Sequence, residues 1–447
     1  MEDKEILMPA LSPTMEEGGI AKWFVKPGDS VKAGDIIAEI ETDKAVMEFE
    51  AVSDCKIKDL LIAEGTTEIK VNSPIATLEI ATSQEAVTSS PKTDRTRETT
   101  KAKSRAKIVE TEEKKSAHQK VGIKTVRESI RDAIAEEMRR DESVFLMGEE
   151  VGEYQGAYKV SQGLLEEFGL RRIIDTPITE HGFTGLAAGA AFAGLRPIVE
   201  FMTFNFSMQA MDQIINTCAK TLYMSGGQMN CPIVLRGPNG AASQVGAQHS
   251  QDFAPWFSSV PGLKVIQPFS ASDAKGLLKT AIRDPNPVIF LENEILYNDS
   301  SASSNTDEDL IPFGKARILK QGLDVTLVSY GIGVKHALNA AKLAEEQGLS
   351  IEIIDLRSLR PLDYETVFSS VKKTNRCITI EECFPMCSIG NHLSASIMEN
   401  VFDYLDAPVI NCTGKDVPMP YAKNLEKAAL VTAEEILTSI NKVTNNV

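Results

Sequence analysis

The chain has 447 residues, more than one hydrophobic core usually holds, so its length predicts two or three domains. Its net charge of -16 argues against nucleic-acid binding, which needs a basic surface. No apolar stretch is long enough to cross a membrane, which predicts a protein without a membrane partner. The seven cysteines lack the paired spacing of a zinc site and are interpreted as reduced thiols.

Residues 1–80 contain an internal pseudo-repeat. The segment Gly28–Ile40 is echoed by Gly65–Leu78, and both copies are short alternating strands separated by Gly, Asp and Asn turns. Two similar halves predict an all-β domain, a flattened barrel with quasi-twofold symmetry. Glu41–Ala45 falls between the copies, where a hairpin turn is expected.

Residues 81–120 differ sharply from the segments on either side. They hold 10 basic and 6 acidic residues, no Phe, Trp or Tyr, and few large aliphatic side chains. Such a segment cannot bury enough apolar surface to offset the entropy lost on ordering. We therefore expect a flexible linker here.

From residue 121 onward the pattern is α/β. A capping box at Thr125–Glu128 predicts the start of a helix, and Leu186–Leu195 is expected to be a tightly packed buried helix. Alternating strands and helices predict parallel, doubly wound sheets in two domains, 121–300 and 312–447, joined by a polar linker at Ser300–Asp309. The expected strands are Val144–Met147, Pro197–Phe201, Pro232–Leu235, Leu263–Ile266, Pro287–Leu291, Val325–Ser329, Ile351–Ile354 and Ile378–Ile380.

The turn at Glu41–Ala45 contains Lys44, which in isolation is best explained as a solvated surface charge. Its flanking segments, Met8–Met15, Val25–Asp29 and Gly34–Asp35, change that interpretation. Together they resemble the lipoyl domains of 2-oxo acid dehydrogenase complexes over residues 1–80. The resemblance implies that a lipoate ligase attaches lipoate to Lys44. A biotin carrier has a similar fold, but its lysine lies between methionines, and Ala45 argues against it.

Five further motifs resemble the β subunits of thiamine-diphosphate-dependent 2-oxo acid dehydrogenases. This resemblance covers nearly all of residues 121–447. It implies a pyrimidine-binding α/β domain followed by an α/β domain like the C-terminal domain of transketolase. The motifs are Asp175–Phe183, Glu200–Phe206, Arg236–Gly240, Gln248–Gln251 and Val417–Tyr421.

The resemblance assigns roles to four residues. Glu180 contacts the aminopyrimidine nitrogen of thiamine diphosphate, where a proton favours the imino tautomer that generates the ylide; burial of its carboxyl group would help it hold that proton. Phe206 stacks on the pyrimidine ring and Met202 lines the same pocket. His249 moves protons or orients lipoamide during acyl transfer. Without the motifs, Glu180 would be interpreted as a helix cap, His249 as a structural histidine, and the other two as core residues.

Two metal predictions also follow from the resemblance. The chain has no Gly-Asp-Gly followed by a distant Asn, the pattern that holds magnesium and diphosphate in thiamine enzymes, so that half of the cofactor site is assigned to a separate α subunit. A structural potassium ion, which prefers oxygen ligands, is expected at a set of mostly backbone carbonyls. The matching residues are Ile233, Ala281, Ile282, Asp284 and Asn286.

Phe201–Met211 and Gly237–Gly240 are similar to the pyruvate-specific members of the family. Such members decarboxylate pyruvate and reductively acetylate lipoamide as α2β2 heterotetramers, and they supply a dihydrolipoyl acetyltransferase core for acetyl-CoA synthesis. The chain shows no targeting peptide, which predicts a bacterial cytoplasmic location. The alternatives are a branched-chain 2-oxo acid dehydrogenase and a non-catalytic lipoyl carrier or scaffold; turnover after addition of an α subunit separates the carrier from the enzymes.

Overall fold

The fold is taken from a computed structural model, which describes residues 2–9, 17–32, 35–41, 46–51, 55–71, 73–80, 121–304 and 310–444. The chain divides into two compact units, Met1–His118 and Gln119–Val447, and each is described by itself. The linker predicted for 81–120 lies outside the described residues. None of the described helices is long and apolar enough to cross a membrane.

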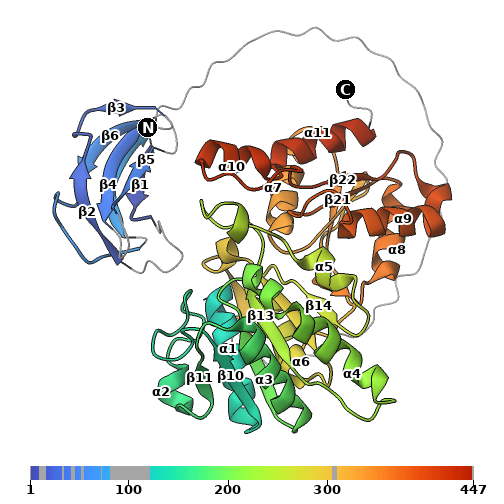
Figure 1. The fold of residues 1–447 in the computed structure, drawn as a ribbon. Helices are drawn as coiled ribbons and strands as arrows, with labels where there is room; N and C mark the ends of the chain where they lie inside the picture. The colour runs from blue at the N-terminus through green and yellow to red at the C-terminus, as the bar shows by residue number, and fades with distance from the viewer. Residues whose placement is uncertain are drawn as a thin grey trace, which may run out of the picture. The chain divides into compact units, whose positions relative to one another are not determined.

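The first unit is built from two four-stranded antiparallel sheets, which confirms the predicted flattened barrel (Figure 1). Alternate residues of each strand point inward, and the enclosed side chains include Ile20, Ile40 and Ile75, all fully buried. One sheet has the order β1 (Glu2–Leu7), β8 (Pro74–Ile80), β6 (Cys55–Leu60), β3 (Ser30–Val31); the other has the order β5 (Val46–Glu50), β4 (Ile36–Glu41), β2 (Glu17–Trp23), β7 (Ile69–Lys70).

The predicted lipoyl-lysine turn connects two paired strands. Strand β4 pairs antiparallel with β5, and Glu41 is opposite Val46 at the end of the ladder. Lys44 belongs to the connection between these two residues and lies outside the described residues.

The second unit begins with a seven-stranded sheet. Its strands are parallel apart from the edge strand β20, which the later part of the chain contributes and which pairs antiparallel with β14. The near-continuous apolar strands suit a sheet covered on both faces. The order is β11 (Ile173–Asp175), β10 (Val144–Gly148), β12 (Arg196–Glu200), β13 (Val234–Pro238), β15 (Val288–Glu292), β14 (Lys264–Ile266) and β20 (Ser358–Arg360).

Helices cover both faces of this sheet. The capping box predicted for the first helix is present, because the Thr125 side chain accepts from the Glu128 amide and the Glu128 side chain accepts from the Thr125 amide. Buried residues of α1, α2 and α6 form one core, and those of α3, η2 and α5 form the other. The elements are α1 (Val126–Arg140), α2 (Leu164–Phe168), α3 (Glu180–Phe192), η1 (Phe204–Ala210), η2 (Gln213–Cys218), α4 (Ala219–Met224), η3 (Ala247–His249), α5 (Ala254–Ser258), α6 (Ala271–Arg283) and η4 (Glu294–Leu296).

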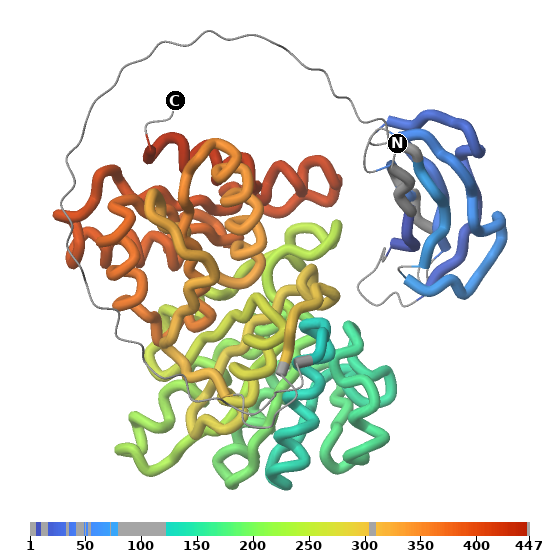
Figure 2. Tube along the Cα trace, turned by 180° about the vertical axis from the view of Figure 1, so that it is seen from behind, coloured from blue at the N-terminus to red at the C-terminus, as the bar shows by residue number. Residues whose placement is uncertain are grey.

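A second, five-stranded sheet forms the C-terminal domain of this unit, in orange and red in Figure 2. Helices α7 and α11 share a core with one face, and α8 and α9 share a core with the other. The sheet order is β17 (Arg317–Lys320), β19 (Ile351–Asp355), β18 (Val325–Ser329), β21 (Cys377–Ile380), β22 (Ile410–Cys412). The helices are α7 (Ile332–Glu346), α8 (Tyr364–Thr374), α9 (Ile389–Val401), η5 (Phe402–Tyr404), α10 (Lys423–Ala429) and α11 (Ala433–Thr444).

Two local expectations differ from the structure. Ser300–Ser304, expected as the start of a linker, form strand β16, which pairs antiparallel with β9 (Val121–Thr125). The helix expected to be buried at Leu186–Leu195 belongs to α3, which ends at Phe192, and it is buried on one face only, because Leu186 is 62% exposed whereas Ala187 and Ala188 are fully buried. A run of Ala, Gly and Leu does not show which side of a helix meets a partner.

Candidate active site

The candidate site forms where the strand order of the seven-stranded sheet reverses. Strand β10 comes first in the parallel part of the sheet, and the next two strands, β11 and β12, lie on opposite sides of it. In open α/β sheets this arrangement opens a crevice beyond the carboxyl ends of the strands, where ligands bind. Glu149 directly follows β10, and Glu180 is the first residue of α3, the helix after β11.

Glu180 and Glu149 are buried together at this edge. Glu180 is 3% exposed and Glu149 is 5% exposed. Burial, and then the nearby charge of Glu180, raise the pKa of Glu149 to about 7. Its Oε1 atom is buried and accepts no hydrogen bond from the residues that the structure describes. The crevice therefore holds two carboxyl groups, and one of them is able to keep a proton near neutral pH.

Glu149 is absent from the set of residues that the sequence motifs single out. One signal was available, because Glu149 comes directly after a predicted strand, at the strand end where functional groups gather in parallel sheets. His181, next to Glu180, is exposed, and its Nε2 atom lies 3.4 Å from Nε2 of Gln213.

Phe206 and His249 come together from segments far apart in the sequence. Phe206 lies in η1, a short helix that packs against α3, and His249 ends η3. Their rings meet edge to face with centroids 5.5 Å apart, and both side chains are half-buried. Asn205 fixes this approach because its Oδ1 atom accepts from the Gln251 amide at 3.1 Å. Met202 lies half-buried between β12 and η1.

His249 also borders a small cavity of about 50 Å³. Tyr158, Thr203 and Glu294 line the same cavity and were not predicted from the sequence. Burial, and then the charge of Glu294, raise the pKa of Tyr158. The structure thus places a protonated phenol and a carboxylate near the predicted active-site histidine.

A buried ion cluster ties together the strands under the site. Arg236 on β13 is fully buried and pairs with Glu200 on β12 and with Glu292 on β15. The Tyr297 hydroxyl donates to Glu292 at 2.6 Å. Burial lowers the pKa of Arg236, but the two carboxylates outweigh it and hold the pKa well above its usual value. The cluster fixes three neighbouring strand ends from which the Phe206 and His249 segments start.

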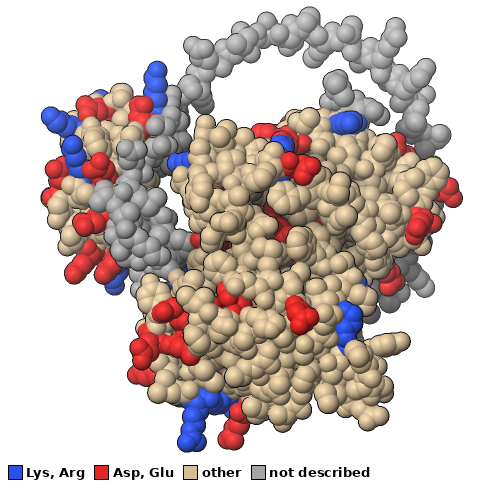
Figure 3. Space-filling model, viewed as in Figure 1, with Lys and Arg blue, Asp and Glu red and all other residues tan. Residues whose placement is uncertain are grey.

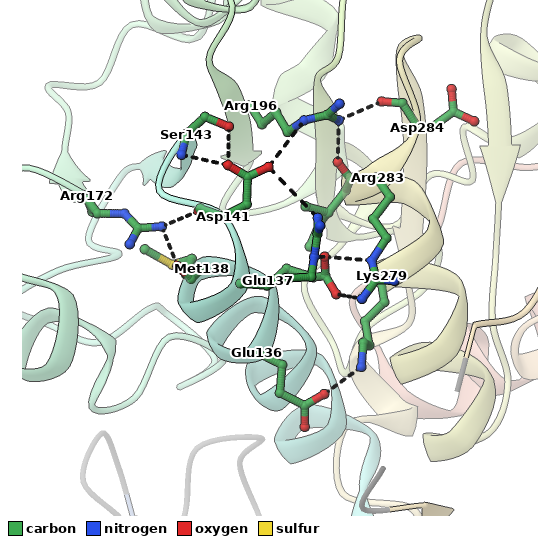
Figure 4. A network of polar contacts seen from close by, with 12 residues as sticks. Glu136, Glu137, Met138, Asp141, Ser143, Arg172, Arg196, Lys279, Arg283 and Asp284 are labelled. Atoms are coloured by element: carbon green, nitrogen blue, oxygen red, sulfur yellow. Dashed lines mark hydrogen bonds and ion pairs between the residues drawn. The ribbon is translucent and has the colours of Figure 1, made fainter. Parts of the chain in front are cut away.

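The residues predicted to bind potassium gather at the opposite ends of the strands. Arg196 donates to the backbone oxygens of Ile282 at 2.9 Å and Asp284 at 3.2 Å, as Figure 4 shows in part. The Ala281 carbonyl accepts from the Asp284 amide. Asn286 Oδ1 is buried and accepts no hydrogen bond from the described residues. This oxygen is of the kind that a hard cation prefers, but Arg196 and Lys264 already place two positive charges at Ile282 and Asp284.

The described residues contain no group of three or more His, Cys, Asp and Glu side chains placed to hold a metal. This finding does not bear on potassium held by carbonyls.

Comparison with known proteins places the three domains. The chain matches the "Transketolase, pyrimidine binding domain" at residues 124–300, the "Transketolase, C-terminal domain" at 314–436 and "Biotin-requiring enzyme" at 4–78. A solved structure titled "Split gene transketolase, inactive beta4 tetramer" covers 72% of this chain and 98% of its own, with a TM-score of 0.59 and 21% identity, which supports the fold alone.

Curated relatives are much closer in sequence. The "Pyruvate dehydrogenase E1 component subunit beta" of Rhizobium meliloti (strain 1021) is 58% identical over 98% of this chain and 99% of its own length. The protein of the same name from Rickettsia bellii (strain RML369-C) is 62% identical over 71% of this chain and 98% of its own. The chain therefore belongs to the family of pyruvate dehydrogenase E1 component β subunits, with a biotinyl/lipoyl-type domain at its N-terminus.

Proposed function

We propose that the chain is the β subunit of an acetyl-transferring pyruvate dehydrogenase, which decarboxylates pyruvate oxidatively and acetylates lipoamide. The observation that carries the proposal is the pair of buried carboxyl groups at the strand reversal, Glu180 and the proton-holding Glu149 within its electrostatic reach, together with the contact between Phe206 and His249. This arrangement also argues against a non-catalytic carrier, since a scaffold has no need of two buried carboxyl groups.

Thiamine diphosphate suits the residues present, and we propose that Glu180, Met202 and Phe206 hold its aminopyrimidine end. When bound, the cofactor supplies an electron sink for the carbon that loses carbon dioxide. Glu180 holds or releases a proton at the ring nitrogen, and its buried position keeps water from competing for that proton. Phe206 offers a ring face to a flat heterocycle. Glu149 stores a proton within electrostatic reach of Glu180.

His249 is proposed to serve the second half of the reaction. It is half-buried beside Phe206, so one edge of its ring remains accessible from outside the crevice. An imidazole can both accept and donate a proton, and it can pass one to a thiolate as lipoamide accepts the acetyl group. The acceptor would be lipoate on Lys44 of this chain or on the acetyltransferase core, and a tethered carrier keeps its group at high effective concentration.

The other half of the cofactor site is assigned to an α subunit in an α2β2 heterotetramer, which would hold the magnesium and the diphosphate. The face of the second unit seen in Figure 3 carries few charged side chains, as an obligate interface does. Large apolar side chains that remain exposed on this unit include Ile178 at 81%, Tyr223 at 89% and Met224 at 79%. A dihydrolipoyl acetyltransferase core and a lipoate ligase complete the proposed partners, and potassium is proposed at the Asn286 site.

The function is tested by reconstitution. The purified chain alone should bind thiamine diphosphate weakly, because it supplies no residues for the diphosphate, and should not turn over pyruvate. Addition of the α subunit from the same cell should give magnesium-dependent binding by calorimetry and pyruvate-dependent reduction of an artificial acceptor. A preference for branched-chain 2-oxo acids in competition assays would favour the alternative dehydrogenase, and no turnover of any 2-oxo acid would favour the carrier.

Lipoylation is tested separately at Lys44. The chain made in cells that lipoylate proteins should gain the mass of one lipoyl group. Peptide analysis should place it on Lys44, since Lys44 belongs to the connection between the paired strands β4 and β5, where the resemblance places the lipoyl lysine. Lys44→Arg should lose the added mass. Lys26→Arg, at an exposed lysine of the same unit, should keep it. A lipoyl group on another lysine would contradict the carrier assignment.

A further inference from the structure

The segment that carries His249 rests against the C-terminal domain at a second crevice. In the five-stranded sheet, β18 comes first among the parallel strands, and β19 and β21 lie on either side of it. In open α/β sheets, ligands usually bind beyond the carboxyl ends of the strands at such a reversal, which here are β18 and β21. Glu382, which follows β21, contacts loop 239–252 of the pyrimidine-binding domain at this place. The place where many open α/β sheets bind a ligand is therefore occupied here by loop 239–252, which carries His249.

Glu382 anchors one end of the loop. Its Oε2 atom accepts from the Ala241 amide and its Oε1 atom accepts from Nδ2 of Asn293, both at 3.1 Å. Gly240 has a positive φ of +86°, and a Cβ atom there would lie 2.1 Å from Glu382 Oε1. The glycine is thus required for the carboxyl group to reach the loop backbone.

Asp252 anchors the other end. Its Oδ1 atom accepts from Nδ2 of Asn239 at 2.6 Å and from the Ala254 amide at 2.9 Å. Asn239 Oδ1 in turn accepts from the Phe253 amide at 2.8 Å. These bonds close the loop on itself, with His249 between the anchors.

Asp252 and Glu382 border one common cavity of about 10 Å³. Asp252 is 8% exposed, and its Oδ2 atom accepts no hydrogen bond from the described residues. Two buried carboxylates at one cavity repel each other, and a proton on one member of the pair removes that repulsion.

We propose that Asp252 and Glu382 are positioning residues for His249: the pair keeps one proton at their common cavity on the domain seam, and in that state the two residues keep loop 239–252 seated. The inference rests on the proposed part of His249 in acyl transfer. It makes the C-terminal domain a proton-sensitive support for the active site.

Burial and the nearby charges favour a state in which the Asp252–Glu382 pair carries one proton. Burial and then the charge of Asp252 raise the pKa of Glu382 to about 8. Burial raises the pKa of Asp252 to about 6, although hydrogen bonds from Asn239 and the Ala254 amide lower it, and Glu381 adds to the rise. Between these values the pair carries one proton.

Other titratable groups at the seam are already engaged, including Glu426 of α10, which accepts from the Gln244 amide of the same loop at 2.7 Å. The Glu381 carboxylate accepts from the Tyr330 hydroxyl at 2.9 Å and from the amides of Ile389 and Gly390 at 3.1 and 2.8 Å. Lys415 borders the same cavity, and its ammonium group pairs with Glu435. Cys383 is buried at the seam, and its thiol donates to the Phe384 carbonyl.

The sign of the pH dependence follows from the raised pKa values. The seated loop keeps a proton that the open loop releases, so seating is fully favoured below the ordinary carboxyl pKa and is lost as pH rises through about 8. The opening constant is the equilibrium ratio of open to seated loop. Because each opening releases one proton, this constant should rise about tenfold per pH unit between about pH 6 and about pH 8.

The test compares Asp252→Asn with the wild type in the assembled enzyme with its α subunit. Asn keeps the Oδ1 acceptor and places an N–H group where Oδ2 has no donor, so it lowers the pKa of Glu382. The opening constant is measured from hydrogen exchange of the Ala241 and Phe253 amides, corrected for intrinsic rates. In the wild type it should rise about tenfold per pH unit, and in Asp252→Asn it should rise much less. Equal slopes would overturn the proposal, and a slope that vanishes on adding sodium or potassium ions would assign the cavity to a cation instead.

A second experiment measures the activity of Glu382→Ala, which removes the acceptor of the Ala241 amide. Lipoyl-domain acetylation should fall about tenfold or more, with a smaller fall in artificial-acceptor reduction, and the exposed Glu365→Gln should match the wild type in both. A normal acetylation rate in Glu382→Ala, with the exchange slope present in the wild type, would overturn the positioning role. Absence of pyruvate decarboxylation in the wild type would instead overturn the proposed function, while the exchange slope would still report on the pair.

Discussion

Replacing Glu180 with Gln should lower pyruvate-dependent turnover by about 10²–10⁴-fold, the range for loss of one general acid–base group. Gln keeps the shape of the buried side chain, which is 3% exposed, but cannot deliver a carboxyl proton. Because the proton transfer precedes every later step, the loss should be the same with an artificial electron acceptor and with lipoamide. Exchange of the thiazolium C2 proton into deuterium oxide should slow in parallel.

His249→Ala should give a different pattern in the same two assays. If His249 serves acyl transfer, lipoyl-domain acetylation should fall much more than reduction of the artificial acceptor. Its contact with the Phe206 ring, at 5.5 Å between centroids, is a packing contact, so binding of thiamine diphosphate should change little. Glu166→Gln, at an exposed glutamate of α2, serves as the matched control and should behave as the wild type.

Two outcomes would contradict this division of labour. Wild-type exchange of the thiazolium proton in Glu180→Gln would remove Glu180 from cofactor activation and direct attention to Glu149, the other buried carboxyl group of the crevice. An equal fall of both rates in His249→Ala would move the histidine to an earlier step, such as decarboxylation.

Arg236→Met should destabilise the second unit by about 3–5 kcal/mol, the cost of breaking a buried ion pair from one side. The change leaves the carboxylates of Glu200 and Glu292, which are 3% and 0% exposed at their side chains, without their shared cation. Burial already raises the pKa of Glu200, and loss of Arg236 removes the interaction that opposes that rise. The variant should therefore recover part of its stability as pH falls and the carboxylates take up protons.

Urea unfolding of the full chain measures this effect. The chain has two tryptophans, Trp23 in the first unit and Trp256 in the second, so a Trp23→Phe background reports on the second unit alone. Arg139→Met, which breaks the exposed pair with Glu167, is the control and should cost about 1 kcal/mol or less. Equal losses in the two variants would show that the buried cluster does not hold the strand ends together.

The sequence predicted the fold class and most of the strands because local patterns determine them. The apolar runs at Val325–Ser329 and Ile351–Ile354 are strands with nearly the expected bounds, since a buried parallel strand needs an unbroken apolar segment. The capping box at Thr125 fixed a helix start through two bonds between residues three apart. Short or polar strands such as Ser300–Ser304 were missed, because they form only by pairing with a distant segment.

The motifs also predicted Glu180, Phe206 and His249 as site residues, and by themselves they indicated the family and the order of the domains, which the comparisons confirm. Only the tertiary structure decided how these residues are supported. Glu149 lies within electrostatic reach of Glu180 because β10 and β11 are neighbours, and Glu382 contacts loop 239–252 because two domains pack together. Sequence patterns record local preference and burial, whereas contacts between residues far apart in the chain, and the pKa values those contacts set, depend on how the sheets and domains assemble.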